Sequence, residues 1–172
     1  MKKSVLVTGI SGSGKTTVCA ALQKLGHSSI DIEQVSGLYN LVNSETGKAV
    51  LGNMEQIDDN VDWVCNKVRI NDLINLQQNS TTFYCGGMSN TEEVWGLFDK
   101  VNILSVSDKI TRYRLSKRKN GEFGSTQKNI EWILSWKHEI EDRWLGMGGI
   151  LLSAEQDPMK VAKSLVVIAD KR

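Results

Sequence analysis

The sequence has few of the residues that mark secreted, metal-binding or membrane-spanning proteins. It holds three cysteines, two histidines and one proline in 172 residues. The cysteines are widely spaced and form no Cys-x-x-Cys pair, which favours reduced thiols and gives no cluster of metal ligands. No stretch approaches the roughly 18 to 20 apolar residues that a transmembrane helix needs. The apolar run after the first lysines ends too early for a signal peptide, so we expect a cytoplasmic protein without membrane association.

A large excess of either charge is also missing. Lysine and arginine number 21 against 20 acidic residues, which gives a formal net charge of +1 at pH 7. Dedicated nucleic-acid binders usually carry a clear basic excess, so we expect no nucleic-acid partner. With 40% hydrophobic residues, the chain is long enough to bury a core, and we expect one domain over residues 1–172. Both a monomer and a homodimer remain open.

Short β-branched strands alternate with amphipathic helices along the chain. Strands are predicted at residues 5–8, 28–32, 81–85, 101–106 and 149–153. Helices are predicted at 18–25, 61–76, 89–98, 108–115 and 130–144, and a last one from Pro158. Alternation of this kind predicts parallel pairing through right-handed crossovers. The expected fold is therefore α/β, a three-layer α/β/α sandwich with a five-stranded parallel sheet.

Several polar residues are placed to cap these helices. Asp58 or Asp59 precedes the helix predicted at 61–76, Ser89-x-x-Glu92 forms a capping-box pattern, and Asp108 and Asp157 precede the last predicted helices. Two segments interrupt the alternation: residues 34–60, rich in Gly, Asn and Ser, and residues 117–128. Long loops in compact domains are usually functional, so we expect an acceptor-binding insert over about 34–80 and a lid over about 117–128.

A phosphate-binding loop follows the first predicted strand. Residues 9–16 read Gly-Ile-Ser-Gly-Ser-Gly-Lys-Thr, which satisfies the P-loop pattern between a strand and a helix. The glycines let backbone N–H groups turn toward phosphates, Lys15 reaches the β- and γ-phosphates, and Thr16 ligates Mg²⁺. We therefore expect ATP and Mg²⁺ to bind at Gly9, Gly12, Ser13, Gly14, Lys15, Thr16 and Thr17.

Charged residues at two other places suit phosphoryl transfer. Asp31 and Glu33 end the second strand and point to the same side if that strand persists. They are expected either to orient an acceptor hydroxyl beside the magnesium nucleotide or to be solvated loop carboxylates. Arg114 and Arg118 share a helical face, which fits triphosphate binding. A solvated helix end and a nucleic-acid patch are the competing interpretations.

Motifs of other P-loop proteins are missing. The guanine-specific Asn-Lys-x-Asp pattern fails at Arg69, and no apolar strand runs into the Asp-Glu pair of a motor ATPase. These gaps place a phosphotransferase ahead of a GTPase or a motor.

Together these motifs resemble the small P-loop kinases, which include adenylate, shikimate and gluconate kinases and bacterial kinase-like ATPases. The resemblance extends from the P-loop through residues 31–33 and Gly86-Gly87-Met88-Ser89-Asn90 to the lid-like residues 114–118. It implies catalytic roles for Lys15, Asp31, Arg114 and Arg118, with Asp31 near Mg²⁺ beside Thr16. It places Glu33, Gly86 and Gly87 on the acceptor side.

The sequence narrows the acceptor only in part. Between Gln34 and Asn66 there are five acids against one lysine, Lys48, and such a surface repels an anion unless Lys48, Lys67, Arg69 or Arg143 reaches in. Tyr39 and Trp63 either stack on a base or belong to the core. A nucleoside or nucleotide is therefore slightly favoured over a sugar or hydroxy acid. A nucleotide-binding regulatory module that transfers no phosphate is the alternative of a different class.

Overall fold

A five-stranded parallel sheet forms the centre of the protein, in a computed structural model that describes residues 2–51 and 60–171. The strand order is β2-β5-β1-β6-β7, and all neighbouring pairs are parallel. The strands are β1 Lys3–Thr8, β2 Ser28–Asp31, β5 Thr81–Cys85, β6 Lys100–Ser105 and β7 Ile150–Ser153. The predicted five-stranded α/β sandwich is therefore confirmed.

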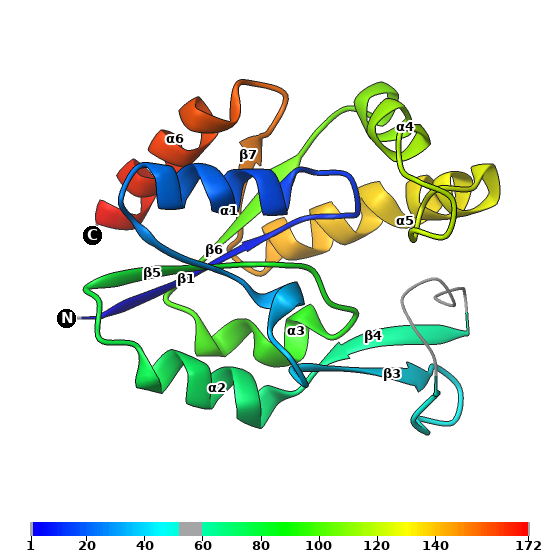
Figure 1. Cartoon of the computed structure of the whole chain (residues 1–172), viewed down its shortest axis with the longest axis horizontal. Helices are drawn as coiled ribbons and strands as arrows, with labels where there is room; N and C mark the ends of the chain where they lie inside the picture. The colour runs from blue at the N-terminus through cyan, green and yellow to red at the C-terminus, as the bar shows by residue number, and fades with distance from the viewer. Residues whose placement is uncertain (1, 52–59, 172) are drawn as a thin grey trace.

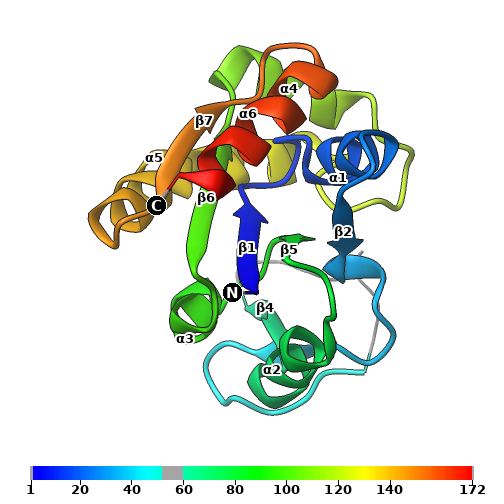
Figure 2. The same cartoon turned by 90° about the vertical axis from the view of Figure 1, so that its left-hand side faces the viewer.

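Helices cover both faces of this sheet (Figures 1 and 2). Val5 and Val7 of β1 pack on one side against helices α1 (Lys15–Lys24) and α6 (Pro158–Asp170). Leu6, between them, points to the other face and packs in the cluster that includes residues of α2 (Lys67–Leu76) and α3 (Thr91–Val94). Alternate side chains of a strand point to opposite faces, so one short apolar strand contributes to two cores.

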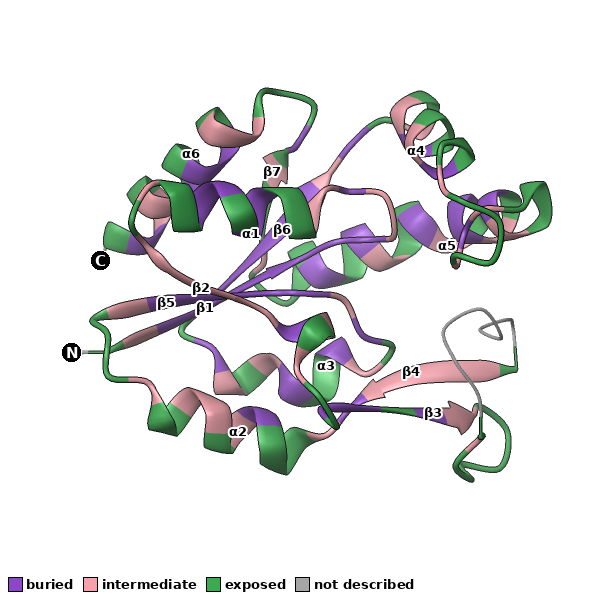
Figure 3. Cartoon of the chain, in the orientation of Figure 1, coloured by how far each residue is buried: buried purple, intermediate pink, exposed green. Residues whose placement is uncertain are grey.

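Two further helices follow β6 in the chain, and the second of them packs back against that strand. Helix α4 spans Asp108–Ser116, and the long helix α5 spans Gln127–Gly146. Two short 3-10 helices, Ile32–Gln34 and Trp95–Leu97, follow β2 and α3. Figure 3 shows that the inner strands β1, β5 and β6 are mostly buried. Among the described residues, no helix has the length and apolarity needed to cross a bilayer.

The helix predicted at 61–76 is wrong in its first third. Val61–Cys65 is strand β4, which pairs antiparallel with β3 (Tyr39–Asn43) as a separate two-stranded sheet. The valines at this spacing fit a strand as well as a helix, and pairing with β3 decides between them. Helix α2 begins at Lys67 because the Asn66 side chain accepts hydrogen bonds from two backbone N–H groups of its first turn. Asp58 and Asp59 lie outside the described residues.

Two of the other predicted caps are displaced by one residue. Helix α3 starts at Thr91 after Asn90, and the Ser89 hydroxyl accepts a hydrogen bond from the Trp63 backbone N–H instead of forming a capping box. Ser107 holds the N-cap position of α4, while Asp108 lies in its first turn and accepts a hydrogen bond from Lys137 at 2.8 Å. The predicted cap at Asp157 is confirmed, because its carboxylate accepts from backbone N–H groups that follow Pro158.

Candidate functional site

The P-loop joins β1 to α1 at the carboxyl end of the sheet. Gly9, Gly12 and Gly14 have φ angles of 154°, 85° and 100°, which side chains rarely tolerate. A Cβ at Gly9 would lie 2.5 Å from the Leu104 carbonyl oxygen, so the loop also passes close to β6. Gly14 caps α1 without a side-chain hydrogen bond. The first N–H groups of α1 therefore have no side-chain cap and can meet an anion.

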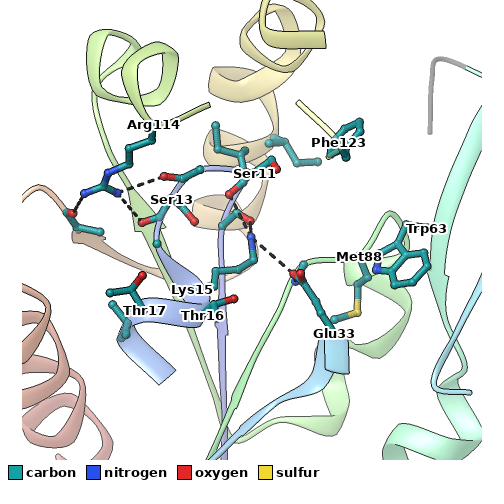
Figure 4. Close-up of a pocket in the computed structure, with 18 of the residues that line it drawn as sticks. Ser11, Ser13, Lys15, Thr16, Thr17, Glu33, Trp63, Met88, Arg114 and Phe123 are labelled. Atoms are coloured by element: carbon teal, nitrogen blue, oxygen red, sulfur yellow. Dashed lines mark hydrogen bonds and ion pairs between the residues drawn. The ribbon is translucent and has the colours of Figure 1, made fainter. Parts of the chain in front are cut away.

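Lys15 lies folded back over this loop (Figure 4). Its Nζ donates to the carbonyl oxygens of Gly9, at 3.0 Å, and Ile10, at 3.2 Å, and lies 3.8 Å from Glu33 Oε1. Burial lowers the pKa of the Lys15 ammonium, and the nearby Glu33 carboxylate opposes that shift. A phosphate in the loop would give this buried cation a stronger partner.

The two acids after β2 have different surroundings. The strand ends at Asp31 and a 3-10 helix starts at Ile32, so the alternation that would keep both acids on one side stops there. Asp31 accepts a hydrogen bond from the Glu33 backbone N–H and caps the 3-10 helix. Glu33 Oε1 accepts from the Gly87 N–H at 2.7 Å and faces Lys15. The structure thus brings Glu33 to the P-loop and keeps Asp31 as a capping residue.

Gly86 and Gly87 lie in the loop after β5, close to Ile32 and Lys15. A Cβ at Gly86 would lie 2.4 Å from Ile32 Cγ1, and one at Gly87 would lie 3.4 Å from Lys15 Cε. The loop after β5 therefore approaches Ile32 and Glu33 closely because residue 86 has no side chain, whereas a Cβ at Gly87 would make an ordinary van der Waals contact.

Arg114 and Arg118 both reach the P-loop from α4 and the segment that follows it. Arg114 donates to the carbonyl oxygens of Gly12, Ser13 and Ala154 at distances of 2.9–3.2 Å. Arg118 donates to Ser11 Oγ at 2.9 Å and to the Phe123 carbonyl oxygen. Burial lowers the pKa of the Arg118 guanidinium. Their proximity to the loop agrees with the predicted phosphate contacts, which stay predictions.

A cavity of about 820 Å³ adjoins the P-loop, Glu33, Arg114 and Arg118. Its P-loop wall includes Gly9, Gly12, Ser13, Gly14, Lys15, Thr16 and Thr17. Figure 4 shows Arg114, which contacts Ala154, on one side of the loop, and Glu33, Trp63, Met88 and Phe123 on the other. The other residues of the lining include Asp62, Trp132, Trp136, Gln156 and Pro158. Asp31 and Gly86 are not among the lining residues, whereas Gly87 is. The volume is at the upper end of the range of ligand sites, about 300–1,000 Å³.

Sequence reasoning misses several of the lining residues. The spacing of Trp132 and Trp136 on α5 favours core positions, and nothing in the sequence gives Gln156 a role. The position of Gln156 in the loop after β7 could have indicated a place in the site, because ligands of parallel α/β sheets bind outside the carboxyl ends of the strands. The predicted lid corresponds to the connection between α4 and α5, in which Phe123 packs edge-on against Trp132 with ring centroids 6.1 Å apart.

The residues present fit a magnesium nucleotide through the P-loop, not through a carboxylate cluster. Among residues 2–51 and 60–171, no group of three or more His, Cys, Asp or Glu side chains is arranged to hold a metal ion. The uncapped start of α1 and the hydroxyl of Thr16 are the features that suit Mg²⁺ bound together with phosphates. The roles of Thr16 and Asp31 toward Mg²⁺ remain predictions.

Sequence comparison agrees with this geometry. The profile of the family described as AAA domain matches residues 5–133, from β1 through the P-loop and α4 into α5. The chain belongs to this AAA domain family. No curated protein sequence matches the chain significantly.

Solved structures place this AAA-domain chain among small P-loop kinase-like folds. It is similar to a sugar kinase from Janibacter sp. HTCC2649, with 16% identity, a TM-score of 0.59, and coverage of 97% of this chain and 94% of that one. It is also similar to shikimate kinase from Acinetobacter baumannii, with 15% identity, a TM-score of 0.60, and coverage of 98% of this chain and 93% of that one. A third similar structure is deoxyadenosine kinase from M. mycoides with bound dATP, with 14% identity, a TM-score of 0.55, and coverage of 98% of this chain and 100% of that one. At these identities the similarity defines the fold.

Proposed function

We propose that the protein is an ATP- and Mg²⁺-dependent phosphotransferase that moves the γ-phosphate of ATP to a hydroxyl group of a small molecule. The observation that carries this proposal is the continuous cavity, which passes from the P-loop to Glu33 and beyond. A protein that only binds or hydrolyses a nucleotide needs no second compartment next to the γ-phosphate position. The kinase folds to which the chain is similar support the same reaction class.

We assign one side of the cavity to ATP and the other side to the acceptor. The side with Arg114, Ala154, Gln156 and Pro158 continues from the P-loop helix and suits the nucleoside of ATP. The side with Glu33, Trp63 and Met88 suits the acceptor. Lys15 lies between them and can leave the Gly9 and Ile10 carbonyl oxygens for the phosphates. Bound with ATP at Thr16, Mg²⁺ would supply neutralisation of phosphate charge.

Transfer requires one bond to form and one to break at phosphorus. The acceptor oxygen bonds to the γ-phosphorus, the bond from that phosphorus to the β–γ bridging oxygen breaks, and ADP leaves. The hydroxyl proton passes to Glu33, whose carboxylate already faces Lys15 and is held by the Gly87 N–H. Lys15, Arg114 and Arg118 stabilise the charge that spreads over the transferring phosphoryl group. Closure of residues 117–128 would exclude water and suppress hydrolysis.

The experiment that tests this function is acceptor-dependent turnover of ATP. ADP release and the mass of the phosphorylated product are measured with nucleosides, nucleoside monophosphates, sugars and hydroxy acids. Lys15→Ala should lower the turnover by a factor of about 10² to 10³, because it removes a cation that acts on the transferring group. Lys24→Ala, on the exposed side of the same helix, should retain it.

The proposal fails if ATP binds and the ADP release is the same with and without every acceptor. That outcome would instead favour the regulatory nucleotide-binding module. A sugar or hydroxy acid as the accepted substrate would support phosphotransfer and identify the alternative acceptor class.

A further inference from the structure

Positive charge in the cavity lies at the P-loop, and of its cations Arg118 also contacts Phe123 on the acceptor side. The cationic residues that line it, Lys15, Arg114 and Arg118, all donate hydrogen bonds to P-loop residues. On the acceptor side the charged lining residues are the acids Glu33 and Asp62. Once ATP occupies the loop, these three cations face the triphosphate. The described acceptor wall then has no cation left for a second anion.

Four other basic residues could have balanced the charge of an anionic acceptor, but none of them lines the cavity. They are Lys48, Lys67, Arg69 and Arg143. Arg69 donates to the Gly37 carbonyl oxygen at 2.7 Å, and Arg143 pairs with Glu92 and Glu139. Lys48 and Lys67 are exposed and are not among the residues that line the cavity. The sequence from residue 49 to residue 66 contains neither lysine nor arginine. An acceptor carrying phosphate or carboxylate would therefore lose its hydration without gaining a counter-ion.

Aromatic surface takes the place of charge on this side. Trp63 stacks on Tyr39 with ring centroids 4.5 Å apart and planes 6° apart, which fixes the indole plane from behind. Trp132 and Trp136 of α5 lie edge-on to one another, with centroids 5.6 Å apart. Figure 4 shows Trp63, Met88 and Phe123 on the same side of the P-loop as Glu33. Rigid indoles of this kind favour a flat ring as ligand.

From these two observations we infer that the acceptor is an uncharged molecule with a planar aromatic ring and a hydroxyl group, that is, a nucleoside. Nucleoside monophosphates, sugar acids and hydroxy acids are disfavoured. The inference rests on the proposed phosphotransfer for the position of the hydroxyl beside Glu33, but binding of the acceptor does not require that transfer occurs. Binding and transfer can therefore be tested separately.

The test is isothermal titration calorimetry with a non-hydrolysable ATP analogue and Mg²⁺ saturating the donor side. Common nucleosides are titrated beside their 5′-monophosphates, with gluconate and shikimate as open-chain and cyclic hydroxy acids. At least one nucleoside should bind about tenfold or more tightly than its own monophosphate. A phosphate placed a few ångströms from the Glu33 and Asp62 carboxylates without a counter-ion is disfavoured by roughly that factor. Tighter binding of any anion than of every nucleoside, or no nucleoside binding, would overturn the inference.

Three substitutions, one of them a control, separate the contribution of the aromatic ring to binding from that of the charge. Trp63→Leu should weaken nucleoside binding about five- to a hundredfold, the usual range for loss of a stacked base. Trp95→Leu, a tryptophan of the 3-10 helix after α3 that does not line the cavity, should leave it within about twofold. Asp62→Lys should reduce the preference for nucleoside over monophosphate about tenfold. Circular dichroism checks that each variant is folded; equal effects of both tryptophan substitutions, or an unchanged preference in Asp62→Lys, would contradict the inference.

The results also distinguish this inference from the proposed function. A nucleoside that binds with this charge preference but is never phosphorylated would retain the inference about the site and reject phosphotransfer. Phosphorylation of a hydroxy acid that binds more tightly than every nucleoside would retain phosphotransfer and reject the nucleoside.

Discussion

Gly86 occupies a position next to the candidate site where no side chain fits. A methyl group there would lie 2.4 Å from Cγ1 of Ile32, which is fully buried, so the chain around Glu33 has to shift. We predict that Gly86→Ala destabilises the protein by about 1–3 kcal/mol, the usual effect of overpacking a core. Urea unfolding followed by circular dichroism measures this change.

Gly96→Ala is the matched control at this scale. Gly96 is exposed, and an added Cβ there meets no atom within 4 Å. Its free energy of unfolding should change by less than about 0.5 kcal/mol. Equal changes for the two substitutions would show that the contact with Ile32 is relieved without cost.

Strand β4 is attached to the loop after β5 by hydrogen bonds of Trp63 with Ser89 and of Cys65 with the Asn90 side chain. Asn90 Oδ1 accepts a hydrogen bond from the Cys65 N–H at 2.9 Å, and its Nδ2 donates to the Cys65 carbonyl oxygen at 3.0 Å. Cys65 is buried, so Asn90→Ala leaves both backbone groups unsatisfied and should lower stability by about 1–3 kcal/mol. Because β4 carries Trp63, the variant should also raise the KM for the acceptor more than the KM for ATP.

Thermal unfolding and steady-state kinetics check both parts of that prediction. Asn40→Ala, at an exposed position of β3, serves as the control and should change neither quantity appreciably. A rise of the two KM values by the same factor in Asn90→Ala would argue that β4 does not carry the acceptor wall.

Across the whole molecule, α5 joins α4 to the sheet through a buried polar cluster. Lys137, only 2% exposed, pairs with Asp108 of α4, and Glu141 accepts a hydrogen bond from Ser105 of β6 at 3.0 Å. Burial raises the pKa of Glu141 above its ordinary value of 4.5, although the hydrogen bond from Ser105 and the charges of Lys137 and His138 oppose the shift. The folded chain therefore holds this proton more tightly than the unfolded chain, and the stability from Glu141 falls as pH rises above about 4.5.

Glu141→Gln cannot ionise and should remove this pH dependence. The Tm of the variant minus that of the natural protein should become more positive from pH 5 to pH 8. Differential scanning calorimetry across this range measures it. Glu139→Gln, an exposed substitution on the same helix, should give a difference that does not vary in this way. A difference that decreases with pH would mean that folding lowers the pKa of Glu141 instead of raising it.

Local sequence determined the features that depend on neighbouring residues alone. The P-loop at residues 9–16, the positions of the five strands and the cap at Asp157 are of this kind, because glycine conformations, β-branched runs and helix caps act over a few residues. The AAA domain match begins in the first of these strands and includes the P-loop.

Tertiary structure decided the features that depend on distant residues. Residues 61–65 fit a helix or a strand until β3 paired with them, and the end of β2 at Asp31 separated Asp31 from Glu33. The proposed aromatic acceptor wall brings Trp63 of β4 together with Trp136 of α5 around one cavity. No spacing in the chain encodes that meeting, because it follows from where the sheet places the ends of its strands and from which faces of the helices are left uncovered.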